Sequence, residues 1–309
     1  MLLNLVIASL LGSSPAAGAE MTAPGDDAPR RWGAEGHRMV GAAAAGALPD
    51  AMPAFFRAAS DQLAYLNPEP DRWKSGEERA LDPAMNAAHS AEHYINFEGL
   101  PASLFAARDR FAYLDSLRAH GHRTPGPGLL PYRILELTQR LRVGFREWRA
   151  ATDPRERAWI EQRILNDAGI LGHFVADGSN PAHTSIHHNG WVGDNPHGYA
   201  TDNGFHARFE SAFVRARVRP EHIAAQMRSP ARVFPDIRPA VLEFLRGSNS
   251  RVEEMYRLDR RRAWEAGNTS EEHRDFAARR LADGAEMLRD LWWTAWVTSD
   301  EGGPRDLKP

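Results

Sequence analysis

The sequence predicts an all-α fold, a single multi-helix domain with long loops. Three observations predict it. Apolar residues recur with helical spacing over long stretches, strand-like alternation is short and rare, and histidines gather with carboxylates near two helical stretches. With 42% apolar residues in 309, the chain can bury a substantial core, and it has no internal repeat. One domain over residues 32–300 accounts for the pattern.

The first 19 residues are typical of an export signal. An apolar run, too short to span a membrane, is followed by the small residues Ala17, Gly18 and Ala19, which fit a cleavage site. Residues 20–31 are polar and contain Pro and Gly, so we expect a linker or propeptide there, and a flexible tail at 301–309. The protein is therefore expected to be secreted or periplasmic. Because it has no cysteine, a large core or bound metal must replace disulfides.

Four stretches carry the helical pattern, namely residues 32–48, 132–148, 154–177 and 274–299. Their expected buried faces include Ile134, Leu135, Leu141 and Phe145 in the second stretch and Phe276, Leu281, Met287, Leu288, Leu291 and Trp292 in the last. Residues 66–100 and 178–203 are expected to be long loops. Loops of that length in a compact domain are usually functional.

The charge of the chain excludes one class of partner recognition. Its formal net charge is -3, with a pI near 6.5. Such a chain has no whole-molecule field that attracts nucleic acid or anionic lipid. Any phosphate binding must therefore be local.

The segment LGHFVADGSNPAH, residues 171–183, concentrates ligand-type side chains. If the helix that begins near Pro154 continues through Asp177, then His173 and Asp177 project from one face, one turn apart. The glycine and proline that follow end this helix, so that His183 lies on a loop that can fold back. Three potential metal ligands can converge there.

A second pair with the same spacing, His206 and Glu210, occurs in the segment GFHARFE. Its buried side is marked by Phe205, Phe209 and Phe213. Imidazole nitrogen and carboxylate oxygen are suitable zinc ligands when no thiolate is available, and both pairs together with His183 could serve one site. The remaining histidines lack this spacing and are expected at the surface: His89, His120, His122, His187, His188, His197, His222 and His273.

Five segments, in this order along the chain, resemble those of one known family. They are WGAEGHRMV with Trp32 and His37, PEPDRW with Asp71, EHYIN with His93, HFVADGSNPAH with His173, Asp177 and His183, and GFHARFE with His206 and Glu210. Together they resemble the zinc-dependent phospholipase C and S1/P1 nuclease superfamily, from Trp32 to about Glu210. The resemblance implies the same all-helical fold and hydrolysis of phosphodiesters.

The resemblance also implies three zinc ions. The first would be held by Asp71, His93, His173 and Asp177, the second by His183, His206 and Glu210, and the third by Trp32, His37 and Asp177, so that Asp177 bridges two metals. Asp61 also precedes the histidine of EHYIN and is the alternative to Asp71. We prefer Asp71 because its Pro-Asp setting resembles the phospholipase version, whereas Asp61 fits a helix surface.

The family chemistry is attack by a zinc-activated hydroxide, with the third zinc stabilising charge on the phosphate. Lys74 or Arg72, beside Asp71, could contact a phosphate oxygen, although a solvated loop charge is the commoner arrangement for either residue. Asn96 stands where the nucleases carry an aspartate that orients water. Glu98 takes that role, or the role is missing, in which case activity is lower.

The third zinc depends on how the N-terminus is processed. Cleavage after Ala19 would leave Trp32 inside the chain, where its amide-linked nitrogen cannot bind zinc. The pair Arg30-Arg31 makes a second cut, directly before Trp32, plausible. Without that cut only His37 and Asp177 would hold the third metal, and that site would be weak or empty.

The residues that carry the resemblance point to two different classes of substrate. The WGAEGH start, the HYIN segment and the 23-residue separation of His183 from His206 resemble nucleases, whereas Glu210, the Pro-Asp setting and the lack of cysteine resemble phospholipases. Tyr94 is a candidate platform for an unstacked base, and Trp191 for an apolar, membrane-facing mouth. We favour a nuclease acting on single-stranded nucleic acid or nucleotides.

Two alternatives stay open. One is a zinc-dependent phospholipase C acting on phospholipids, with transient contact to a membrane surface. The other is a non-catalytic helical protein that uses zinc only as a staple, in which case the sites would be closed by four protein ligands. In each reading we expect a monomer with no stable protein partner.

Overall fold

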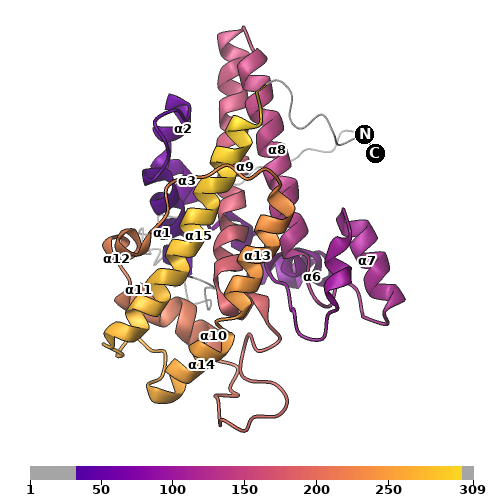
Figure 1. The fold of residues 1–309 in the computed structure, drawn as a ribbon, viewed down its shortest axis with the longest axis vertical. Coiled ribbons are helices and arrows are strands. Elements are labelled where there is room, and N and C mark those ends of the chain that lie inside the picture. The colour runs from indigo at the N-terminus through magenta and orange to yellow at the C-terminus, as the bar shows by residue number, and fades with distance from the viewer. Residues whose placement is uncertain (1–32, 301–309) are drawn as a thin grey trace, which may run out of the picture.

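The computed structural model describes residues 33–300, which form helices joined by loops (Figure 1). Within this range no strand forms, and an isolated bridge joins His188 and Gly190. The all-α prediction is therefore confirmed. The predicted signal peptide, linker, Trp32 and C-terminal tail lie outside the described residues. None of the helices in this range combines the length and hydrophobicity needed to cross a membrane.

Three long helices, α8 (Leu130–Ala150), α9 (Pro154–Ser179) and α15 (Glu271–Val297), run side by side along the long axis of the molecule (Figure 1). α1 (Gly33–Gly46) packs against α9 and α15. All four helices were predicted from periodicity, with ends that differ by a few residues. The predicted buried face of α8 is wrong at one residue. Leu135 is only half-buried, and Leu137 lies in the core instead because it is nearer the centre of the apolar stripe.

The other helices are short and surround this bundle. They are α2 (Ala54–Arg57), α3 (Ser60–Leu66), α4 (Glu69–Arg72), α5 (Gly76–Leu81), α6 (Pro83–Ser90), η1 (Ala91–His93), η2 (Ala102–Ala106), α7 (Arg110–Ala119), η3 (Pro181–Thr184), α10 (Phe205–Ala207), η4 (Arg208–Phe213), α11 (Val214–Arg217), α12 (Pro220–Gln226), α13 (Ile237–Asn249) and α14 (Val252–Arg261).

The expectation of a long loop at residues 66–100 is wrong, because α4, α5, α6 and η1 lie there. Local capping explains these helices. The Ser75 side chain accepts a hydrogen bond from the Glu78 amide at the start of α5, and the Asp82 side chain caps α6, in which Pro83 is the first residue. α5 has no buried residue. It therefore lacks the apolar periodicity by which longer helices are recognised.

The C-terminal half of α9 is buried on every side, from residue 167 to 179. Two glycines let the neighbouring chain approach it closely. A Cβ at Gly169 would lie 2.3 Å from Leu66 Cβ, and one at Gly172 would lie 2.2 Å from the Asn67 side chain. The turn at residues 66–67 is therefore seated directly on α9, next to the histidine-bearing segment.

The expectation that His273 lies at the surface is wrong. Its side chain is buried, and its ring packs against Trp264 with centroids 4.6 Å apart. Its Nε2 lies 3.0 Å from the carbonyl oxygens of Leu258 and Arg262, so that the ring closes the connection between α14 and α15. The ring is a polar group satisfied inside the core.

Candidate metal centre

The predicted ligands meet at the C-terminal end of α9. Three groups form, in each of which the ligand atoms lie within 4.8 Å of one another: His37, Asp71 and His173; His93, His173 and Asp177; and His183, His206 and Glu210. These side chains come from α1, α4, η1, α9, η3, α10 and η4. Segments up to 173 residues apart in sequence, from His37 to Glu210, thus contribute to one place.

Asp177 lies between two pairs of histidines. Its Oδ2 is 2.8 Å from His93 Nδ1 and 3.2 Å from His173 Nε2. Its Oδ1 is 3.6 Å from His37 Nε2 and 3.7 Å from His183 Nε2. Each oxygen of this carboxylate therefore faces its own pair of imidazole nitrogens. A carboxylate in this position could be shared between metal ions.

Backbone carbonyls fix the orientation of three of these rings. The Nδ1 atoms of His173, His183 and His206 each lie within hydrogen-bonding distance of a carbonyl oxygen. The acceptors are Asn67 at 2.9 Å, His93 at 2.7 Å and His188 at 3.1 Å, respectively. Because a carbonyl only accepts, each Nδ1 carries the hydrogen, and in the neutral ring Nε2 then presents a lone pair. Metal-binding histidines are held in this way.

These lone pairs point at carboxylate oxygens. His206 Nε2 lies 2.7 Å from Glu210 Oε2, and His183 Nε2 lies 3.5 Å from the same oxygen. Two acceptors in contact repel unless a cation or a proton lies between them. His37 is fully buried and stacked on His173, and neither of its ring nitrogens makes a hydrogen bond within residues 33–300. The donor set therefore fits divalent cations that prefer nitrogen and oxygen ligands.

The electrostatics keep His37 and His93 neutral and the carboxylates ionised, whereas at His183 burial is outweighed by Asp177 and Glu210, which raise its pKa. Burial, reinforced by His173, lowers the pKa of His37 to about 4, and burial together with Lys74 lowers that of His93 to about 3. Burial alone would raise the pKa of Asp177, but His183 and His173 outweigh it and hold this pKa well below its usual value. Neutral imidazole and ionised carboxylate are the forms that bind metal.

Glu210 lies on a turn of π-helix. η4 continues the helix begun by α10, and Phe205, Phe209 and Phe213, all fully buried, anchor this stretch as predicted. Single π-turns inside helices occur frequently at functional sites. The Asn180 side chain donates a hydrogen bond of 3.1 Å to Glu210 Oε2. The carboxylate is thus oriented both by the helix and by the residue that ends α9.

Asp71, and not Asp61, reaches the cluster. Asp71 Oδ1 lies 3.8 Å from His173 Nε2 and 4.0 Å from His93 Nδ1, whereas Asp61 is exposed on α3. The Lys74 Nζ lies 3.1 Å from Asp71 Oδ1. Its side chain is only 4% exposed, so the expectation of a solvated loop charge is wrong for Lys74, because the ion pair with Asp71 holds it inside.

Arg72 carries a solvated charge, as expected, although it lies in α4 and not in a loop. Arg72 is exposed, forms an ion pair with Glu69 and lies over the Tyr65 ring. Two of the candidate ligands are partly exposed to solvent: the Asp71 side chain is 25% exposed and that of His206 is 16% exposed. The other ligand candidates in the described residues are 5% exposed or less.

Two residues considered for orienting water lie beyond His93. The Asn96 backbone donates to the Pro127 carbonyl, and within residues 33–300 its side chain takes no part in the hydrogen bonds and ion pairs that join the cluster. Glu98 accepts hydrogen bonds from Ser185, Ile186 and Asn249. It is therefore occupied in holding a loop.

Both aromatic candidates are partly buried. The Tyr94 hydroxyl donates to the Gly126 carbonyl at 3.3 Å, and burial raises the pKa of Tyr94. Trp191 is stacked on His187, with ring centroids 3.9 Å apart, and packs against Tyr199 and Tyr256. It forms part of an aromatic cluster under its loop, so His187 is also half-buried.

Sequence reasoning missed Asn67 and Asn180. The first orients His173 through its carbonyl, and the second orients Glu210 through its side chain. A signal for both was present, because each precedes a proline, and Asn-Pro pairs mark turns where a helix stops. Both turns place an asparagine beside the cluster.

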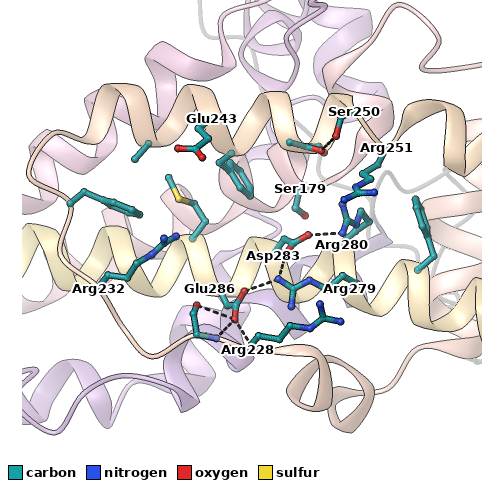
Figure 2. Close-up of a pocket in the computed structure, with 18 of the residues that line it drawn as sticks. Ser179, Arg228, Arg232, Glu243, Ser250, Arg251, Arg279, Arg280, Asp283 and Glu286 are labelled. Carbon is teal, nitrogen blue, oxygen red and sulfur yellow. Dashed lines mark hydrogen bonds and ion pairs between the residues drawn. The ribbon is translucent and has the colours of Figure 1, made fainter.

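A large cavity has none of these candidate ligands in its lining (Figure 2). It measures about 1010 Å³ and is bounded by α13, α14 and α15, with Ser179 in its lining. Its lining contains five arginines and six carboxylates. Several of them pair with one another, as in the ion pairs of Asp283 with Arg279 and Arg280 (Figure 2). The cavity therefore has no surplus of positive charge for a phosphate.

Comparisons with known proteins identify no relative. The chain matches no family model, no curated protein and no solved structure. The geometry of the cluster is therefore the main evidence for what the protein does.

Proposed function

We propose that this protein is a zinc-dependent phosphodiester hydrolase of the phospholipase C and S1/P1 nuclease type, acting on single-stranded nucleic acid or nucleotides. The observation that carries the proposal is the position of Asp177 between two histidine pairs, one at each oxygen. The neighbouring group of His183, His206 and Glu210 supports a second metal position within reach of the first. Multinuclear centres of this kind suit phosphodiester hydrolysis.

The chain's own residues account for most of what such a site needs. Zinc, when bound, supplies Lewis acidity and lowers the pKa of water, so that hydroxide is available at neutral pH. Backbone carbonyls hold the histidine rings, which fixes the direction of each Nε2 lone pair. Lys74, whose side chain is only 4% exposed, adds a buried positive charge beside Asp71.

A third zinc, held by Trp32, His37 and Asp177, remains part of the proposal. Its support is the buried His37 ring, whose nitrogens make no hydrogen bond to another described residue and whose Nε2 lies 3.6 Å from Asp177. Trp32 lies outside the described residues. The proposal of export, with removal of residues 1–31, would give Trp32 the free amine that this site uses.

The aromatic side chains favour a nuclease over a phospholipase. Trp191, the candidate for a membrane-facing mouth, is packed into an aromatic cluster, whereas Tyr94 is half-buried next to the ligand His93. One observation favours the phospholipase alternative. Leu81 and Met85, on α5 and α6 shortly after Asp71, are 78% and 53% exposed, as side chains that meet a lipid surface would be.

A purely structural role for zinc is the second alternative. Structural zinc sites are closed by four protein ligands, whereas catalytic sites keep a position open. The group of His183, His206 and Glu210 contains three candidate ligands, and His206 is partly exposed. An open position in this group supports the enzyme.

The direct test is hydrolysis by the purified, zinc-loaded protein beginning at Trp32. Single-stranded DNA, RNA and phosphatidylcholine are incubated in parallel, and an Asp177→Asn variant is the control. We expect nucleic acid cleavage that the variant lacks. Release of diacylglycerol would establish the phospholipase instead, and bound zinc without either activity would establish the structural role.

A further inference from the structure

Residues 183–190 contribute twice to the second metal group, His183, His206 and Glu210. His183 itself lies in η3, and the carbonyl of His188 holds the Nδ1 of His206 at 3.1 Å. The positions of both imidazoles therefore depend on one segment, residues 183–190. This segment contains no helix after η3. Contacts from outside must fix its shape.

Glu98 supplies one anchor for this loop. Its Oε1 accepts hydrogen bonds from Ser185 Oγ at 2.6 Å and from Asn249 Nδ2 at 3.1 Å, and its Oε2 accepts from the Ile186 amide at 3.0 Å. Asn249, the last residue of α13, also donates to the Thr184 carbonyl at 2.8 Å. One carboxylate thus ties the loop to α13.

The strand-like segment that carries Glu98 is itself paired with the loop. The Ile95 amide donates to the His183 carbonyl at 2.9 Å, and the His93 carbonyl accepts from His183 Nδ1 at 2.7 Å. Glu98 therefore adds side-chain hydrogen bonds to the backbone hydrogen bonds that join the segment of His93 to that of His183. The first and second metal groups are connected through it.

Tyr256 of α14 supplies a second, independent anchor. Its hydroxyl donates to the His187 carbonyl at 2.6 Å and accepts from the Gly190 amide at 3.1 Å. The ring is fully buried and stacked on Phe205, one residue before His206. This anchor brackets His188 in the chain.

We propose that Glu98 and Tyr256 are positioning residues of the second metal group, His183, His206 and Glu210, acting through the loop at residues 183–190. This inference rests on the metal binding in the proposed function but not on its substrate. Glu98 is thereby assigned to orienting ligands and not to orienting water. Changing such supporting residues typically lowers metal affinity about 10- to 100-fold.

The test compares Glu98→Gln and Tyr256→Phe with the wild-type chain. The glutamine is isosteric, but its amide faces either the Ile186 amide or the Asn249 amide, so that a donor meets a donor. Glu243→Gln, an exposed carboxylate on α13, is the matched control. Zinc affinity is measured by competition with a chelator, and the visible spectrum of the Co²⁺ form reports ligand geometry. Thermal unfolding is followed with and without zinc.

We expect both variants to bind the zinc of the second group about 10- to 100-fold less tightly, with a changed Co²⁺ spectrum and a smaller zinc-induced rise in Tm. The control should behave as wild type. Equal losses of Tm with and without zinc, at unchanged zinc affinity and spectrum, would reduce both residues to a fold role and overturn the inference. Zinc binding without hydrolysis would reject the proposed enzyme alone, whereas absence of zinc binding by the wild-type chain would reject both.

Discussion

At the scale of single residues, the orientation of the candidate ligand side chains is set by backbone and amide groups that would not themselves bind metal. The Asp177 carboxylate is ionised because histidines surround it, and three of the neighbouring rings are held by carbonyl oxygens. A side chain amide holds Glu210. The chemistry of the site therefore belongs to the ligand side chains, and its precision to backbone groups around them.

The choice between Asp71 and Asp61 gives a prediction at this scale. We expect Asp71→Asn to lower zinc content and to reduce hydrolysis at least about a hundredfold, because a lost metal costs several kcal/mol of transition-state stabilisation. Asp61→Asn, at an exposed position, should leave both unchanged. Elemental analysis and initial rates measure the two effects. A zinc loss in the Asp61 variant alone would reverse the assignment.

At the scale of elements, two glycines lower the helix propensity of α9 and allow the turn at residues 66–67 to pack closely against it. Gly169 and Gly172 are poor helix formers, yet they admit Leu66 and Asn67 to the helix surface. Asn67 in turn holds His173. The helix is therefore weakened locally in order to place a carbonyl where a ligand histidine needs one.

Two glycine substitutions test this trade. Gly169→Ala should lower the free energy of unfolding by about 1 to 3 kcal/mol, because its Cβ would lie 2.3 Å from Leu66 Cβ. Gly247→Ala on α13, where a Cβ meets nothing within 4 Å, should raise it by about 0.5 to 1 kcal/mol. Urea denaturation measures both. A gain of stability in the Gly169 variant would show that the turn at 66–67 yields easily.

The connection between α12 and α13 is held by one face of α15. Glu286, Asp290 and Thr294 are spaced by four residues and accept hydrogen bonds from the Ser229, Arg232 and Phe234 amides, respectively. This extended segment lies across α15 in Figure 1. Its backbone groups, which lack helical partners, are satisfied by side chains of the helix beneath.

Glu286 makes the stability of this connection depend on pH. Burial by itself would raise the pKa of Glu286. The Ser229 and Arg228 amides and Arg279 outweigh burial, so the pKa of Glu286 lies below the ordinary 4.5. The unfolded chain then binds the proton more readily, so the stabilisation is present above about pH 4.5 and disappears as pH falls through the folded-state pKa. Glu286→Gln should cost about 1 to 3 kcal/mol at pH 7.

Denaturation of wild type and Glu286→Gln at pH 7, 5 and 3 measures this dependence. The difference between the two proteins should shrink as the pH falls. Asp283→Asn, on the same helix but partly exposed, is the control and should show a smaller difference at pH 7. A difference that stays constant down to pH 3 would contradict the role given to the Glu286 carboxylate.

At the scale of the whole molecule, one bundle carries the cluster at its centre. α1, α8, α9 and α15 pack together, and the ligand candidates lie where α9 ends inside this core. The chain has no cysteine, so disulfides contribute nothing to its stability. Bound metal would offset the cost of gathering buried carboxylates and imidazole lone pairs.

Metal removal is therefore expected to lower Tm. Zinc at about a thousand times its Kd would contribute about 4 kcal/mol to folding, and chelation by EDTA removes that contribution. Scanning calorimetry before and after EDTA, and after zinc is restored, measures the effect. Dithiothreitol is the control and should change nothing. An unchanged Tm, with zinc shown by elemental analysis to be gone, would argue against a metal at this cluster.

The sequence by itself determined the all-α class, the four long helices and most of the residues that meet at the cluster. The class and the helices follow from apolar periodicity, and the two histidine-carboxylate pairs from i to i+4 spacing, whereas His37, Asp71 and His93 were expected only from the proposed resemblance. Capped short helices such as α5 escaped it because they bury little, and the surface assignment of His273 failed because burial depends on distant residues.

Only the tertiary structure decided how the ligands face one another. Several of these contacts join segments that are far apart in the chain. They are the hydrogen bonds to the Asn67 and His188 carbonyls, the hydrogen bonds that Glu98 accepts, and the contacts that bury Lys74. No spacing rule encodes such contacts, because they form only when helices pack and bring unrelated backbone groups together. Ligand identity is therefore local information, whereas ligand orientation is a product of packing.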